Sequence, residues 1–89
     1  MFTLEESRQI LKALPSMFDS HDFIRMGALI ASPSFLDLLK EYSANFQTID
    51  SQIGQFLNRQ SNDLSISKIG EHESETIIGT NSKCALWKK

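Results

Sequence analysis

The order of patterns between residues 46 and 87 constrains the fold more than any other feature of this chain. Residues 46–59 carry apolar side chains at helical spacing, which predicts an amphipathic helix. Two strand-like segments follow at residues 64–69 and 83–88, with a Gly-Thr-Asn-Ser turn signal before the second. A helix followed by a β-hairpin is therefore predicted for the C-terminal half.

Three further helices are predicted before this segment. Thr3 and Glu6 form a capping box, which predicts a helix over 3–14 that Pro15 ends. Asp19 or Ser20 can cap a second helix at 21–31. Ser32 and Pro33 resemble an N-cap followed by proline at the first helical position, and a third helix at 33–43 is expected. The fourth helix is the one at 47–59.

The intervening segments are expected to be short connections. Residues 16–19 and 60–63 are predicted as connector and turn, residues 70–74 as a loop, and residues 76–78 as a brief strand. Asn45 tolerates left-handed geometry between the third and fourth helices. Gly27 and Gly54 lie inside predicted helices, where they suggest close helix packing.

These elements predict one α+β domain over residues 1–89, mostly helical, with four helices followed by a C-terminal β-hairpin. Residues 1–31 would form an N-terminal helical pair, and residues 33–89 the second part. A chain of 89 residues is the size of a single domain with a small core.

Composition excludes several classes of function. The net charge is −2, so the chain as a whole does not attract phosphate or anionic lipid. The single cysteine, Cys84, excludes an intramolecular disulfide and a cysteine-rich zinc site. No signal peptide or apolar run of membrane-spanning length is visible, which favours a cytoplasmic protein without membrane contact.

The third and fourth helices form a candidate helix-turn-helix. In that motif, exposed residues of the second helix contact base edges in the major groove. Gln, Ser and Thr side chains suit base edges, and Arg and Lys suit phosphates. The predicted DNA contacts are Gln47, Thr48, Ser51, Gln52, Gln55, Arg59, Lys68 and Lys83.

Residues 33–89 resemble winged helix-turn-helix domains in the order of their elements. The segment SQIGQFL stands where the recognition helix would be, and LSISKIG and KCALWKK stand where the wing strands would be. The resemblance implies a small protein that binds double-stranded DNA and regulates transcription, with a homodimer on paired half-sites as the usual arrangement. The charge departs from this pattern, because residues 46–89 hold five basic and five acidic side chains and the segment GEHESE is acidic.

That departure leaves other functions open. The main alternative is a protein–protein interaction module on the same scaffold without DNA binding. It would use the glutamine-rich helix face or an apolar patch of Met17, Phe18 and Trp87. A third interpretation is a structural fragment of a larger protein.

The remaining reactive side chains favour structural roles. Cys84 is expected to be a small buried hydrophobe, and Trp87 to pack against the helices. His72 is expected in a solvated charged turn and His21 in a capping position. No nucleophile motif or phosphate loop is present, so neither an enzyme, a metal site nor a cofactor is expected.

Overall fold

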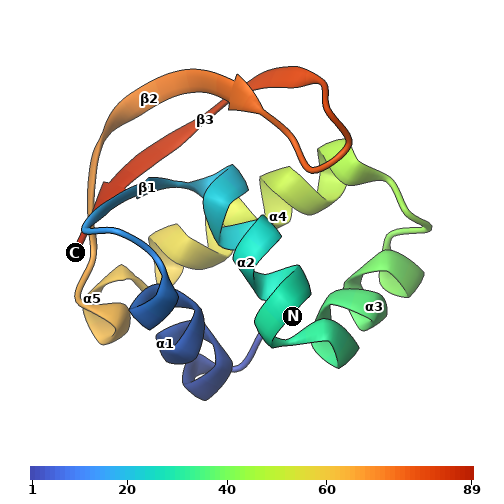
Figure 1. The fold of residues 1–89 in the computed structure, drawn as a ribbon, viewed down its shortest axis with the longest axis horizontal. Helices are drawn as coiled ribbons and strands as arrows, with labels where there is room; N and C mark the ends of the chain where they lie inside the picture. Colours follow the sequence, from blue (N-terminus) through green and yellow to red (C-terminus); the bar gives the residue numbers. More distant parts are fainter.

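The computed structural model describes residues 1–89 as an α+β fold that is mostly helical (Figure 1). Its elements are α1 (Leu4–Ala13), β1 (Met17–Asp19), α2 (Ser20–Ile30), α3 (Ser32–Glu41), α4 (Phe46–Arg59), α5 (Ser61–Leu64), β2 (Ser67–Glu75) and β3 (Asn81–Lys88). The predicted α+β class is confirmed, but the helices number five rather than four.

The sheet has three antiparallel strands in the order β1–β3–β2, so it is larger than the predicted two-stranded hairpin. Trp87 of the central strand lies opposite Phe18 of β1 on one side and Lys68 of β2 on the other. The register shifts between Lys68 and Gly70, which is a β-bulge. Residues 17–19 are predicted from the sequence as part of a connector. That prediction is wrong, because these residues pair with β3, far along the chain, and so form strand β1.

The boundaries near β2 also differ from the prediction. Residues 61–64 form the short helix α5 instead of a turn, and Ser65 ends it in left-handed geometry with φ 56°. The residues predicted as a loop, 70–74, continue β2 because β3 pairs with them along their whole length. Residues 76–78 form the connecting turn rather than a strand.

α2 and α4 lie at the centre of the helical layer, and β2 and β3 arch over them (Figure 1). α2 packs against α1, α3 and α4, and β3 contacts both α2 and α4. α3 packs mainly against α2. α4 therefore packs mainly against α2, rather than against the preceding helix α3 as the expected helix-turn-helix requires.

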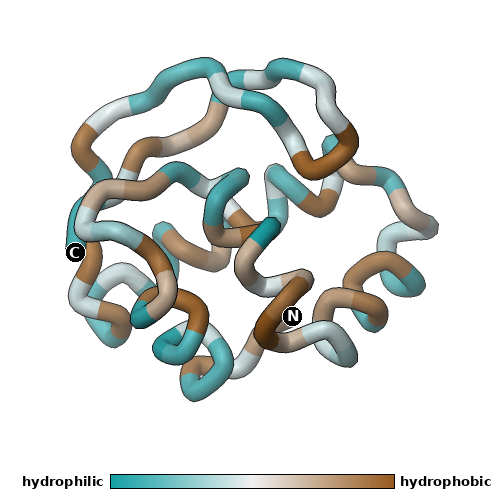
Figure 2. Tube along the Cα trace, in the orientation of Figure 1, coloured by the Kyte–Doolittle hydropathy of each residue, from teal (hydrophilic) through white to brown (hydrophobic).

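One apolar core joins the helices to the sheet. Sixteen buried apolar residues form a single cluster. Phe18 and Trp87 are each 1 % exposed, and the Trp87 indole donates a hydrogen bond of 3.1 Å to Ser20 Oγ. The packing role predicted for Trp87 is confirmed, whereas the surface patch of Met17, Phe18 and Trp87 is wrong because only Met17 is exposed. Figure 2 shows hydrophilic residues along much of the β2–β3 arch.

Helix ends follow the local sequence in two of four predicted cases. The capping box of Thr3 is present, and Asp19 caps α2. Ser32 does not cap α3: it is the first helical residue, and its hydroxyl donates back to the Ala28 carbonyl. Asn45 is the N-cap of α4 rather than a left-handed residue, and positive φ angles fall on the two residues before it.

The two helical glycines have different surroundings. A Cβ on Gly27 would overlap with the ring of Phe2, which packs against α2 from the N-terminal segment. The close neighbour is thus an aromatic ring rather than a helix. A Cβ on Gly54 would have no heavy atom within 4 Å, so the prediction of tight packing there is wrong. Gly54 instead leaves open space beside α4.

None of the helices combines the length and the apolar character that a membrane crossing requires.

Candidate functional site

A groove runs between the exposed side of α4 and the outer part of the sheet. Its cavity has a volume of about 440 Å³. We call it the α4 groove, and it is lined by Ser51, Gly54, Gln55, Asn58, Lys68, Glu71, Lys83, Cys84, Ala85 and Trp87. The open space at Gly54 forms part of its floor.

Four of the eight predicted DNA-contact residues come together in this groove. Ser51 and Gln55 lie on α4, while Lys68 lies on β2 and Lys83 on β3. Gln47 and Ser51 line a neighbouring pocket. The other three predicted contacts, Thr48, Gln52 and Arg59, line neither cavity.

The two lysines of the groove share one acidic partner. Lys68 Nζ lies 3.1 Å from Glu71 Oε1, and Lys83 Nζ lies 3.6 Å from Glu71 Oε2. The hydrogen bond from Lys68, helped by the charges of both lysines, holds the pKa of Glu71 below its ordinary value. All three side chains are solvent-exposed, so these pairs are weak and can exchange partners.

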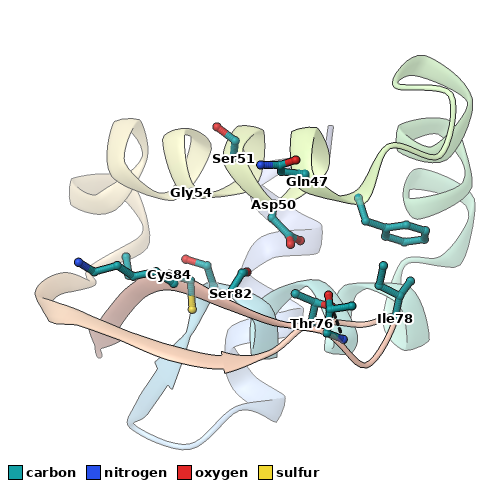
Figure 3. Close-up of a pocket in the computed structure, with 13 residues that line it drawn as sticks. Gln47, Asp50, Ser51, Gly54, Thr76, Ile78, Ser82 and Cys84 are labelled. Carbon is teal, nitrogen blue, oxygen red and sulfur yellow. Dashed lines mark hydrogen bonds between the residues drawn. The ribbon is translucent and has the colours of Figure 1, made fainter.

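The neighbouring pocket lies between α4 and the turn that joins β2 to β3, with a volume of about 580 Å³. Figure 3 shows Asp50 pointing from α4 into this space, toward the two strands. We call it the Asp50 pocket. It is lined by Ser20, Phe46, Gln47, Asp50, Ser51, Gly54, Thr76, Ile78, Thr80, Ser82, Lys83, Cys84 and Ala85.

Asp50 carries an acceptor that no side chain or backbone group satisfies. Its Oδ1 atom is buried without a hydrogen-bond partner, and Oδ2 lies 3.6 Å from His21 Nε2. Burial raises the pKa of Asp50, against the attraction of His21 and Arg25. A ligand that donates a hydrogen bond or carries positive charge would satisfy this oxygen.

His21 is held in a buried polar network rather than in the expected capping role. It is 1 % exposed. Its Nδ1 lies 2.7 Å from Ser74 Oγ, and its Nε2 lies 3.3 Å from Ser82 Oγ. The capping role belongs to Asp19, whose Oδ1 accepts a hydrogen bond from the Asp22 amide. The imidazole therefore links α2 to both long strands.

A second polar group lies on the sheet and includes two residues that were expected elsewhere. His72 Nε2 lies 2.8 Å from Asp19 Oδ2, so His72 belongs to β2 and not to a solvated turn. Cys84 is only half-buried and lies 3.6 Å from Ser74 Oγ, which replaces the expected apolar surroundings. Burial raises the pKa of the Cys84 thiol.

Sequence reasoning missed Asp19, His21 and Asp50 as members of polar sites. Asp50 carried a usable signal, because it falls four residues after Phe46 and three before Ile53 on the apolar stripe of α4. A carboxylate on a buried face is uncommon without a partner. Nothing local marked Asp19 or His21 as members of these polar groups, since the Asp19–His72 and His21–Ser74 contacts each join residues that are 53 positions apart.

Comparison with family models, with curated proteins and with solved structures found no match for the chain.

Proposed function

We propose that this chain binds double-stranded DNA through α4 and the α4 groove. The observation that carries the proposal is that the groove brings Ser51 and Gln55 of one helix beside Lys68 and Lys83 of two strands. Hydroxyl and amide groups suit base edges, and lysines at the rim suit phosphates. A transcription regulator of the winged-helix type would use these groups in that way.

The order of the elements supports this proposal. α4 has a buried apolar face and an exposed polar face, and two consecutive antiparallel strands follow it after the short helix α5. A helix enters the major groove with its exposed residues toward the bases. On this proposal, α4 is the recognition helix and the β2–β3 pair is the wing.

Glu71 sets the strength of the proposed contact. It pairs with both groove lysines, so a DNA phosphate must compete with its carboxylate for them. Glu73 and Glu75 follow on the same exposed strand and also repel phosphate. The expected binding is therefore weak and sensitive to salt.

Replacing Glu71 with Gln should strengthen DNA binding about three- to fivefold, because it frees both groove lysines to contact phosphates. Lys68→Gln should weaken binding. Fluorescence anisotropy with a labelled random-sequence duplex at low salt measures both changes. Glu5→Gln is the matched control, since it removes the same charge from the exposed face of α1.

The comparison with the control separates a local effect from one of net charge. The groove is supported as the binding surface if DNA affinity rises more in Glu71→Gln than in Glu5→Gln and falls in Lys68→Gln. Equal rises in affinity in the two glutamate variants, with no fall in Lys68→Gln, would contradict it.

A protein-interaction module is the second candidate. The observation that favours it is the exposure of apolar side chains on α2 and α3, where Leu29 is 77 % and Leu36 53 % exposed. Such residues suit a contact with another protein, including a second copy of the chain. Self-association in sedimentation experiments without DNA binding at low salt would favour this candidate.

A further inference from the structure

Each of the three strands contributes one potential metal ligand to the same region of the sheet. Asp19 ends β1, His72 lies in β2 and Cys84 lies in β3, the central strand. Their donor atoms all lie within 4.8 Å of one another. His72 and Cys84 are direct partners in the strand register. We call these three residues the sheet cluster.

The backbone and the neighbouring groups already orient the three donors. Asp19 Oδ1 accepts the Asp22 amide at the start of α2, which turns Oδ2 toward His72 Nε2 at 2.8 Å. Ser74 Oγ lies 3.6 Å from the Cys84 sulfur and 2.7 Å from His21 Nδ1. The buried network around His21 thus lies directly behind the cluster, as outer groups do behind metal ligands.

We propose that the sheet cluster binds one divalent ion of the zinc type through Asp19 Oδ2, His72 Nε2 and Cys84 Sγ. A carboxylate oxygen, an imidazole nitrogen and a thiolate sulfur are all zinc ligands. Cys84 binds as the thiolate and releases its proton to solvent. The softer sulfur and imidazole donors favour zinc over magnesium or calcium.

The distances require only a small rearrangement. Zinc bonds of about 2.0–2.3 Å in a tetrahedron set ligand atoms roughly 3.3–3.7 Å apart. The Asp19–His72 contact must therefore open slightly from 2.8 Å, and donor atoms that lie up to 4.8 Å apart must close to that range. The His72 side chain is 42 % exposed, so water can reach the fourth position.

A bound ion would join all three strands and the N-cap of α2. The bond from the ion to Asp19 would add most to the attachment of β1, because β1 has only three residues and pairs with β3 alone. The ion would hold β1 to β2 across the central strand. The proposed ion uses none of the groove lysines, although Cys84 also lines the α4 groove.

Titration of the full chain with cobalt(II), followed by absorbance, tests the proposal. A thiolate-to-cobalt charge-transfer band should appear and should disappear when zinc is added in excess. Cys84→Ser should abolish the band, and His72→Gln should weaken cobalt affinity about tenfold or more. Circular dichroism of both variants establishes that each still folds.

Glu73→Gln is the matched control. Glu73 follows His72 on β2 but projects to the opposite face of the sheet. Glu73→Gln therefore removes a negative charge close to the cluster without removing a ligand. The expected result is unchanged affinity in this variant. Absence of the band in the folded wild-type protein would overturn the proposal, as would equal losses in Glu73→Gln and His72→Gln.

Discussion

Replacing Asp19 with Ala is expected to lower the free energy of unfolding by about 2–3 kcal/mol. Asp19 is 4 % exposed, and its carboxylate accepts the Asp22 amide at 2.8 Å. Loss of an N-cap costs about 1 kcal/mol, and loss of a hydrogen bond to a charged group costs about 1.5–3 kcal/mol. The contact between Asp19 and His72 is partly exposed, so the cost of losing it lies toward the lower end of the second range.

Urea unfolding in the presence of a chelator measures this cost. Asp19→Asn should lose less stability than Asp19→Ala, because asparagine also caps helices well. Asp37→Ala is a control on an exposed aspartate of α3 and should change stability by less than about 0.5 kcal/mol. An Asp19→Ala variant as stable as the Asp37→Ala variant would contradict the capping role.

The Asp19 contribution should also depend on pH. Burial acts to raise the pKa of Asp19, but the Asp22 amide, with Ser74 and His72, holds it below its ordinary value. A carboxylate with a lowered folded pKa stabilises the fold above its unfolded value, about pH 4. The stability difference between wild type and Asp19→Ala should therefore shrink as pH falls below about 4.

Replacing Gly27 with Ala is expected to lower the free energy of unfolding by about 2 kcal/mol. The added methyl would overlap with the Phe2 ring, which is 3 % exposed and packs edge-on against Phe23 at 5.8 Å. Overpacking a core costs about 1–3 kcal/mol, and the better helix propensity of Ala offsets only part of that. Urea unfolding followed by the fluorescence of Trp87 measures the change.

Gly54→Ala is the matched control for Gly27→Ala. Both glycines lie inside helices, but a Cβ at Gly54 meets open space. This variant should gain up to about 1 kcal/mol from helix propensity. Changes of opposite sign in the free energy of unfolding of the two variants support the close packing of Phe2 against Gly27, and equal changes would contradict it.

The sequence was most informative where local patterns decide the structure. The capping box at Thr3, the cap at Asp19 and the apolar stripe of α4 predicted three helices close to their observed positions. Strand β1 could not be predicted, because its three residues become a strand only by pairing with residues 86–88. The extension of β2 through an acidic segment has the same cause, since pairing with β3 overrides weak local preference.

The candidate site was predictable only in part. The polar face of α4 follows from helical spacing, so Ser51 and Gln55 could be found from the sequence. Their meeting with Lys68 and Lys83, and the position of Glu71 between those lysines, depend on how β2 and β3 fold back over α4. The sheet cluster depends on the same folding, because its ligands come from three separated strands.

The salt dependence of binding to a labelled random-sequence duplex tests the proposed function most directly. On the proposed function, Arg59, Lys68 and Lys83 would supply up to three phosphate contacts, so the logarithm of the association constant should fall against the logarithm of salt with a slope of about −3. Fluorescence anisotropy from low to physiological salt gives this slope. A slope near that value supports DNA binding by these residues. No binding at the lowest salt, or a slope near zero, would contradict it.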